Sequence, residues 1–251
     1  MGNYVSKIIS LAERELGYKE KASNSQLDEK TANVGNANYT KYARDLDNIP
    51  GFYNGKKNGF AWCDVFVDWL FVKAFGVDEA KRLLCQPDNS CGAGVDWSAN
   101  YFKHKGKFYT SPKVGDQIFF TNSNRVPCHT GIVYKVDASN VYTIEGNTNS
   151  NSGVVDNGGM VCMKAYSLNY SRIYGYGRPD YDPEPENTKE EEKMITETRY
   201  NTIEEMPSYA TATIDKLVRK GYLKGDGKGL DLSLDMVRML VILDRAGMFG
   251  E

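Results

Sequence analysis

The chain of 251 residues is 41% hydrophobic and 25% charged, which is enough apolar material for a core and indicates one or two domains. Its formal net charge of −2 gives no reason to expect nucleic acid or an anionic membrane surface as a partner. No segment approaches the roughly 20 consecutive apolar residues of a membrane helix, so we expect no membrane insertion.

The first expected element is an amphipathic helix at the N-terminus, closed by Gly17. Charged residues occur throughout it, whereas a signal peptide has an uninterrupted apolar centre. We therefore expect no signal peptide. The apolar stripe consists of Val5, Ile8, Ile9, Ala12 and Leu16.

A second helix is expected to begin at or near Cys63, because apolar residues recur at helical spacing after it and Gly76 is a stop signal. Unpaired backbone N–H groups and the positive end of the helix dipole stabilise a thiolate at this position. The same N–H groups can later hold an oxyanion. Cys63 is therefore the candidate nucleophile. The alternative is a small buried cysteine that opens a core helix.

The candidate base is one of only two histidines. His104 lies in a polar, lysine-flanked helix end, where an exposed side chain is the simpler interpretation. His129 opens a run rich in β-branched and aromatic residues, 129–136, which predicts a strand. A turn and a second such run, 141–147, follow, so the two segments predict a hairpin.

The expected hairpin register pairs His129 with Asn147 and Gly131 with Glu145. His129, Glu145 and Asn147 would then share one face of the sheet. Either Glu145 or Asn147 could accept the ring N–H of His129 and orient the imidazole. A slip of one residue would abolish this arrangement, and the alternative is that both are solvated strand-end residues.

Metal sites are weakly indicated. Zinc bound by Cys128, His129 and Cys162 is disfavoured because adjacent Cys and His lack the usual ligand spacing. The segment 45–48 with Asn54 could hold calcium, although an ordinary polar turn is the simpler interpretation. We therefore predict no metal or cofactor, with calcium as the exception to test.

The composition changes after Tyr181. Residues 181–195 are acidic, contain proline and are nearly free of apolar side chains, which predicts an extended linker. In residues 196–251, a helix is expected from Pro207 to Gly221, and a second is expected to be capped by Ser233.

Several segments in order resemble the CHAP (cysteine, histidine-dependent amidohydrolase/peptidase) domains of phage endolysins and bacterial autolysins. No single segment is specific, but the ordered set over about 175 residues is. The segments are Trp62–Cys63 with Phe66–Val67, Lys113–Phe120, His129–Val133, Glu145–Asn147 and Ile173–Pro179.

The resemblance implies an α+β, papain-like fold for residues 1–180, with N-terminal helices packed on an antiparallel sheet. It implies that Cys63 is the nucleophile and His129 the general base and acid, with Glu145 and Asn147 orienting the imidazole. Asn58 is the candidate for a second oxyanion donor.

The substrate implied by the resemblance is an amide bond of bacterial peptidoglycan, either the N-acetylmuramoyl-L-alanine bond or one in the stem peptide or cross-bridge. Trp62, Asn149 and Asn151 are the candidate substrate contacts. A papain-like acyltransferase and a noncatalytic wall-binding protein are the alternatives.

Endolysins stay in the host cytoplasm until a holin opens the membrane, so the resemblance supplies a route to the wall without a signal peptide. Residues 196–251 resemble a single S-layer-homology-like unit, which we expect to be a small all-α module. Its expected role is wall binding. The alternative is a stabilising or homo-oligomerising appendage, because about 55 residues form a marginal independent fold.

Overall fold

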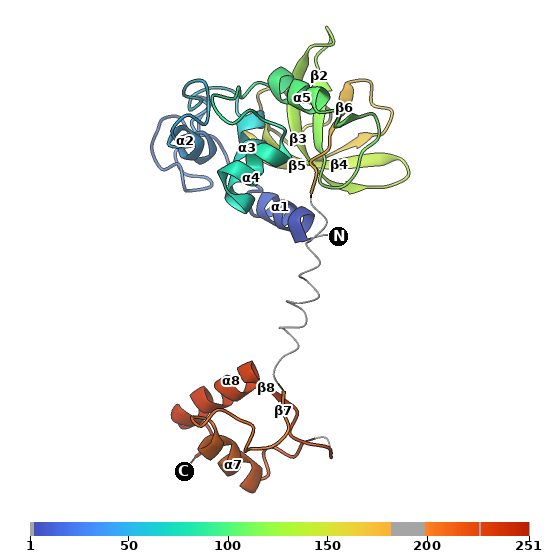
Figure 1. Ribbon diagram of the computed structural model, residues 1–251. Helices are drawn as coiled ribbons and strands as arrows, with labels where there is room; N and C mark the ends of the chain where they lie inside the picture. Colours follow the sequence, from blue (N-terminus) through green and yellow to red (C-terminus); the bar gives the residue numbers. More distant parts are fainter. Residues whose placement is uncertain (1–2, 182–198, 226, 251) are drawn as a thin grey trace. The chain divides into compact units, whose positions relative to one another are not determined.

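The computed structural model describes residues 3–181, 199–225 and 227–250 (Figure 1). The chain divides into two compact units, Met1–Asp182 and Pro183–Glu251. The predicted linker, 181–195, lies outside the described residues except for Tyr181. That residue packs in the N-terminal unit, where its hydroxyl donates a 2.8 Å hydrogen bond to the carbonyl oxygen of Gly115. The ordered N-terminal unit therefore extends past the predicted boundary at residue 180.

The N-terminal unit has a helical layer arranged around one buried helix. Every residue of α3 from Cys63 to Phe71 is buried, so this helix packs against neighbours on all sides. Figure 1 shows α2, α3 and α4 together on one side of the sheet. The helices are α1 (Asn3–Arg14), α2 (Lys41–Asp47), α3 (Cys63–Phe75), α4 (Val77–Leu83) and α5 (Val95–His104).

A six-stranded antiparallel sheet, in the order β1-β6-β2-β3-β4-β5, forms the second layer. This mixture of helices and an antiparallel sheet confirms the predicted α+β class. The two strands of the predicted hairpin correspond to β3 and β4, and the resembling segments Lys113–Phe120 and Ile173–Pro179 overlap β2 and β6, whereas β1 and β5 were not predicted. The strands are β1 (Phe108–Tyr109), β2 (Gln117–Thr121), β3 (Pro127–Val136), β4 (Asn140–Thr148), β5 (Met160–Ser167) and β6 (Ile173–Gly177).

The contact between α3 and β4 depends on a glycine. A Cβ atom at Gly146 would lie 2.6 Å from Cβ of Phe66 and 2.8 Å from Cζ3 of Trp62. Trp62 and Phe66 are both fully buried beside Tyr42. Burial stabilises the fold by roughly 2–3 kcal/mol for each large apolar side chain. Gly146 thus brings the end of β4 against the start of α3.

The C-terminal unit contains β7 (Arg199–Tyr200), α7 (Thr211–Arg219), β8 (Leu232–Ser233) and α8 (Leu234–Arg245). The predicted cap is present, because Oγ of Ser233 accepts a hydrogen bond from the Met236 N–H at 3.2 Å. The unit is not purely helical as predicted, since β7 and β8 pair and bury Tyr200 and Leu232. Pro207 also precedes the first helix instead of opening it, because its carbonyl closes a turn with Ala210.

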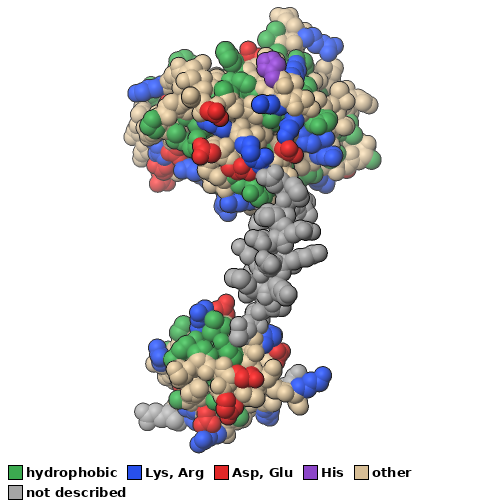
Figure 2. Space-filling model, viewed as in Figure 1, with side chains coloured by type: hydrophobic (Ala, Val, Ile, Leu, Met, Phe, Trp, Pro, Cys, Tyr) green, Lys and Arg blue, Asp and Glu red, His purple; other side chains and the backbone are tan. Residues whose placement is uncertain are grey.

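Among the described residues, no helix is long and apolar enough to span a bilayer. Basic and acidic side chains are interspersed over the visible face of each unit (Figure 2).

Candidate active site

Cys63 is the first residue of α3, where the sequence predicted a helix start. Trp62 occupies the preceding position and gives no side-chain cap, while its carbonyl accepts the Phe66 N–H at 2.9 Å. The N–H groups of the first turn therefore face the region of the Cys63 sulfur without a side-chain acceptor. Such N–H groups can stabilise an oxyanion bound beside Cys63.

His129 and Glu145 form a fully buried pair. Nε2 of His129 lies 2.9 Å from Oε2 of Glu145, and neither side chain is exposed. The register places Ile132 opposite Ile144. This is the same register as the one predicted from the sequence, which pairs position 131 with 145. Gly131 makes room for the contact, because a Cβ there would lie 2.6 Å from Cγ of Glu145.

The carboxylate of Glu145 is held by two further donors. The hydroxyl of Thr143 donates to Oε1 at 2.5 Å, and the hydroxyl of Tyr166 donates to Oε2 at 3.2 Å. A buried carboxylate needs such partners, because an unpaired charge in a low dielectric is costly. With three partners Glu145 is fixed, and the imidazole that it holds is fixed with it.

Burial alone lowers the pKa of His129, but the Cys63 sulfur and the Glu145 carboxylate together outweigh burial and raise it from 6.5 to about 10. The imidazolium is therefore the favoured form at neutral pH. Since Nε2 is directed at Glu145, Nδ1 is the ring nitrogen left for Cys63. Nδ1 is buried and has no hydrogen-bond partner among the described residues.

Asn147 does not share the orienting role of Glu145. Its Oδ1 accepts the N–H of Gly159 at 3.2 Å, and its carbonyl oxygen accepts the N–H of Gly158 at 2.8 Å. Its φ of 55° is in the left-handed region, and its Nδ2 is buried without a partner. The structure therefore assigns the imidazole contact to Glu145, and it places Asn147 in the support of the loop before β5.

Two predicted site residues have structural positions instead. Asn58 was the candidate oxyanion donor, but its Oδ1 accepts the Thr40 N–H at 3.0 Å and its Nδ2 donates to Asn24 at 2.9 Å. Its amide is thus used in joining loops. Trp62 was a candidate substrate contact, but it is 0% exposed and its indole N–H donates to Glu20. A side chain in the core cannot contact a polymer.

Asn149 and Asn151 lie in the loop after β4, where both carbonyl oxygens accept hydrogen bonds from Nζ of Lys164. The N–H of Asn151 also donates to Oδ1 of Asn149 at 3.0 Å. These bonds give the loop its shape. The substrate contact proposed for the two side chains stays a prediction.

The acidic residues considered for calcium are used by protein donors. Asp45 accepts from Arg44, Trp69 and Lys73, and Asp47 accepts the N–H groups of residues 57 and 58. Over the described part of the chain, no three His, Cys, Asp or Glu side chains are grouped to hold a metal. All five cysteines are free thiols.

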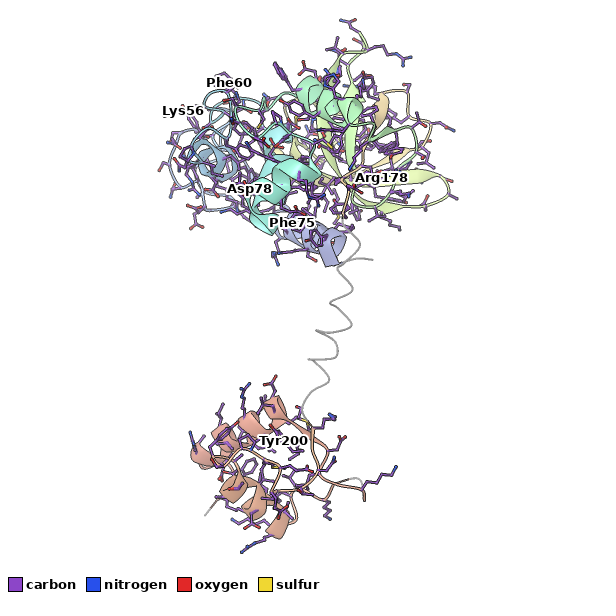
Figure 3. The ribbon with its side chains drawn as sticks, in the orientation of Figure 1. Lys56, Phe60, Phe75, Asp78, Arg178 and Tyr200 are labelled. Atoms are coloured by element: carbon purple, nitrogen blue, oxygen red, sulfur yellow. The ribbon has the colours of Figure 1, made fainter. Side chains whose placement is uncertain are left out.

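An open groove near the start of α3 was missed by the sequence interpretation; Ala61 lines it, whereas Cys63 does not. It has a volume of about 390 Å³ and runs between the loop before α3 and the start of α5. Two of its aromatic side chains are strongly exposed, Phe60 at 64% and Trp97 at 52%. Figure 3 shows Lys56 and Phe60 close together on the loop before α3. The lining residues are Asn54, Lys56, Lys57, Phe60, Ala61, Gly92, Ala93, Gly94, Asp96 and Trp97.

Two features connect the lining of the groove to the start of α3. Ala61 lines it two residues before Cys63, and Ser98 of α5, next to Trp97, donates a 2.7 Å hydrogen bond to Asp64. A sequence signal was present, because Phe60 follows Gly59 in the loop before α3, and Trp97 lies in the first turn of α5, shortly after Gly92 and Gly94. Large aromatic side chains at such positions are candidates for exposed contact surfaces.

Residues 55–147 match the family model of the CHAP domain. The match includes Cys63, His129, Glu145 and Asn147, and it ends before the last of the resembling segments, Ile173–Pro179. No curated protein matches the chain. The match supports a CHAP-domain peptidoglycan hydrolase, since CHAP domains as a family are cysteine- and histidine-dependent amidohydrolases.

Proposed function

We propose that the chain is an endolysin that cleaves an amide bond of bacterial peptidoglycan through an acyl-enzyme on Cys63. The observation that carries the proposal is the buried imidazole of His129, bonded to Glu145 at 2.9 Å, together with Cys63 as the first residue of α3. This arrangement lies wholly within the segment that matches the CHAP domain. An activated thiol with a fixed acid beside it suits amide cleavage.

The reaction follows from these positions. The Cys63 thiolate attacks the amide carbonyl carbon, and the resulting oxyanion accepts hydrogen bonds from N–H groups of the first turn of α3. His129 donates its Nδ1 proton to the amide nitrogen, the C–N bond breaks and the amine leaves. His129 then takes a proton from water, which attacks the thioester. The C–S bond breaks and the acid product leaves with Cys63 restored.

The groove lined by Phe60, Ala61 and Trp97 is the proposed substrate site. Exposed Phe60 and Trp97 can pack against the apolar faces of sugar rings or peptide side chains. Lys56 and Lys57 add positive charge on one wall, which suits the carboxylates of a stem peptide.

The experiment is digestion of purified peptidoglycan, followed by mass spectrometry of the soluble products. An N-acetylmuramoyl-L-alanine amidase releases intact stem peptides from the glycan, whereas an endopeptidase releases fragments with new termini within the peptide or cross-bridge. A product joined to an added amine instead of water would identify an acyltransferase. Failure of the folded protein to release any product would overturn the proposal.

For the C-terminal unit we propose wall binding, supported by its S-layer-homology-like sequence. We also propose that the protein stays in the host cytoplasm until a holin releases it. Sedimentation with purified walls tests the first proposal, and fractionation of host cells before and after holin expression tests the second.

A further inference from the structure

A buried glutamine lies between the neighbours of the two reactive residues. Asp64 follows Cys63 on α3, Thr130 follows His129 on β3, and Gln117 belongs to β2. Nε2 of Gln117 lies 3.1 Å from Oδ1 of Asp64 and 3.1 Å from Oγ1 of Thr130. One amide group therefore donates to both elements that carry the reactive side chains.

The two hydrogen bonds from Gln117 to Asp64 and Thr130 form a bridge, and each acceptor makes a further hydrogen bond. The hydroxyl of Thr130 donates to the carbonyl oxygen of Ile118 at 2.7 Å, so its proton is used and its lone pair is free for Gln117. Asp64 also accepts from the hydroxyl of Ser98 at 2.7 Å. Gln117, Asp64 and Thr130 are each at most 1% exposed. Hydrogen bonds of this kind, shielded from water, hold their partners in one geometry.

A polar residue at position 117 is not what the sheet requires. The following residues of β2, Ile118, Phe119 and Phe120, are fully buried apolar side chains. Burying an amide is unfavourable unless it is hydrogen-bonded, so an apolar side chain would serve packing alone equally well. The two donated bonds are the feature that distinguishes Gln117 from its neighbours.

We propose that Gln117 is a positioning residue that fixes Cys63 relative to His129 by joining the start of α3 to β3. The expected effect of Gln117 on kcat rests on the proposed function, whereas its effect on the position of Cys63 relative to His129 does not. Apolar packing resists sliding of a helix over a sheet only weakly, while a bifurcated amide fixes direction and distance. A displacement of about 1 Å can lower a rate by about 10²-fold.

The chain provides a matched control. One turn further along α3, Asp68 accepts a 2.7 Å hydrogen bond from Nε2 of Gln86 and another from the hydroxyl of Tyr53. Gln86 and Asp68 are 8% and 1% exposed. This pair has the same chemistry as Gln117 with Asp64, but it has no link to β3. Loss of either glutamine deprives a buried aspartate of α3 of an amide donor.

The test compares Gln117→Met with Gln86→Met in the full chain, using a soluble muropeptide as substrate. We expect Gln117→Met to lower kcat at least tenfold with KM within twofold of wild type, and Gln86→Met to change kcat less than twofold. Thermal unfolding of both variants gives their structural costs. Equal losses of kcat in the two variants would assign Gln117 a structural role only.

A second readout does not depend on hydrolysis. With two histidines, NMR titration follows His129 against His104, an internal reference on α5. We expect the midpoint of His129 to fall by at least one pH unit in Gln117→Met and to stay unchanged in Gln86→Met. An unchanged midpoint in Gln117→Met would overturn the inference. Wild-type protein that leaves the muropeptide intact would count against the proposed function alone.

Thr130 keeps the inference testable if Gln117→Met does not fold. Thr130→Val removes the hydroxyl acceptor with almost no change of shape, and Thr130→Ser retains it. We expect the valine variant to show both the kcat loss and the lowered His129 midpoint, and the serine variant to show neither. Equal behaviour of the two would contradict the bridge.

Discussion

Nε2 of His129 is bonded to Oε2 of Glu145 at 2.9 Å, and both side chains are sealed from solvent. The carboxylate thus acts in a low dielectric, where it stabilises the imidazolium more than it would in water. It also decides which ring nitrogen faces which partner. With Nε2 directed at Glu145, the proton on Nδ1 is available to the leaving group of a substrate held at Cys63.

Removal of either reactive group should abolish activity. We expect Cys63→Ala and His129→Ala each to lower the rate of peptidoglycan cleavage by at least ~10²-fold, because the nucleophile and the acid act as a unit. His129→Ala should also be the less stable variant, since it leaves the buried Glu145 without its main partner. Turbidity of wall suspensions measures the rate, and circular dichroism checks the fold. Substantial lysis by folded Cys63→Ala would exclude the thiol mechanism.

The pH dependence should identify Glu145 as the orienting residue. His129 must be protonated to release the amine, and its pKa is raised from 6.5 to about 10, so the acid form is lost only as the pH approaches 10. Glu145→Gln removes a negative charge that raises this pKa. We therefore expect its alkaline activity limb to move towards neutral pH, with a lower kcat.

Asn147→Ala is the comparison for that prediction. Because Asn147 supports the loop at Gly158 and Gly159, its loss should lower activity and thermal stability without moving the alkaline limb. Rates on a soluble muropeptide between about pH 6 and 10 separate the two variants. An identical limb in wild type and Glu145→Gln would mean that Glu145 does not tune His129.

Features set by local sequence were predictable. The start of α3 at Cys63 and the serine cap of α8 follow from apolar spacing and cap chemistry. Alternation along a hairpin predicted that His129 shares a face with Glu145 and Asn147, with either as its partner, and the register changes only near the turn, between Val133 and Lys135. Gly131 lies between His129 and this change of register.

Features set by distant partners were not predictable. Trp62 is next to Cys63, yet Glu20 binds its indole and holds it in the core. Asn58 has a suitable side chain, yet Thr40 and Asn24 bind its amide. Gln117 looks like an ordinary strand residue until Asp64 and Thr130 are brought beside it. Strand β5 lacks a β-branched run, and its edge pairing with β4 defines it instead.

The groove lined by Phe60, Ala61 and Trp97 should contribute to substrate binding. We expect Trp97→Ala to lower kcat/KM about tenfold, mainly through KM, which corresponds to about 1.4 kcal/mol of lost contact. Since the indole is 52% exposed, the melting temperature should hardly change. Tyr174→Ala, an exposed aromatic residue outside the groove, is the control. Equal kcat/KM for Trp97→Ala and wild type would remove the groove from the substrate site.

Activity should survive a chelator and be lost to a thiol alkylating agent. The carboxylate of Asp45 is already neutralised by Arg44 and Lys73, so a cation has little to gain there. Lysis assays with and without chelator, followed by readdition of single metals, measure this. Recovery that needs calcium would revive the site at Asp45 and Asp47, and recovery that needs zinc would favour the site at Cys128.

The last prediction concerns the two units. A fragment ending after Asp182 keeps Tyr181, whose ring stacks on Phe71 and whose hydroxyl binds Gly115, together with the whole candidate active site. We expect this fragment to fold and to cleave soluble muropeptides at close to the full-length rate. On intact walls its lysis should fall most at low enzyme dose, because a wall-binding unit raises the local enzyme concentration.

A fluorescent protein fused to residues 196–251 separates binding from assembly. If this unit binds the wall, the fusion should sediment with purified walls, and the fragment should stay monomeric in light scattering. The alternative role would use the exposed apolar residues of α8, Met236, Met239 and Ile242, to join copies of the chain. In that case the fusion stays in solution, the full chain is an oligomer, and the oligomer is lost on truncation. That result would reject wall binding as the function of the C-terminal unit.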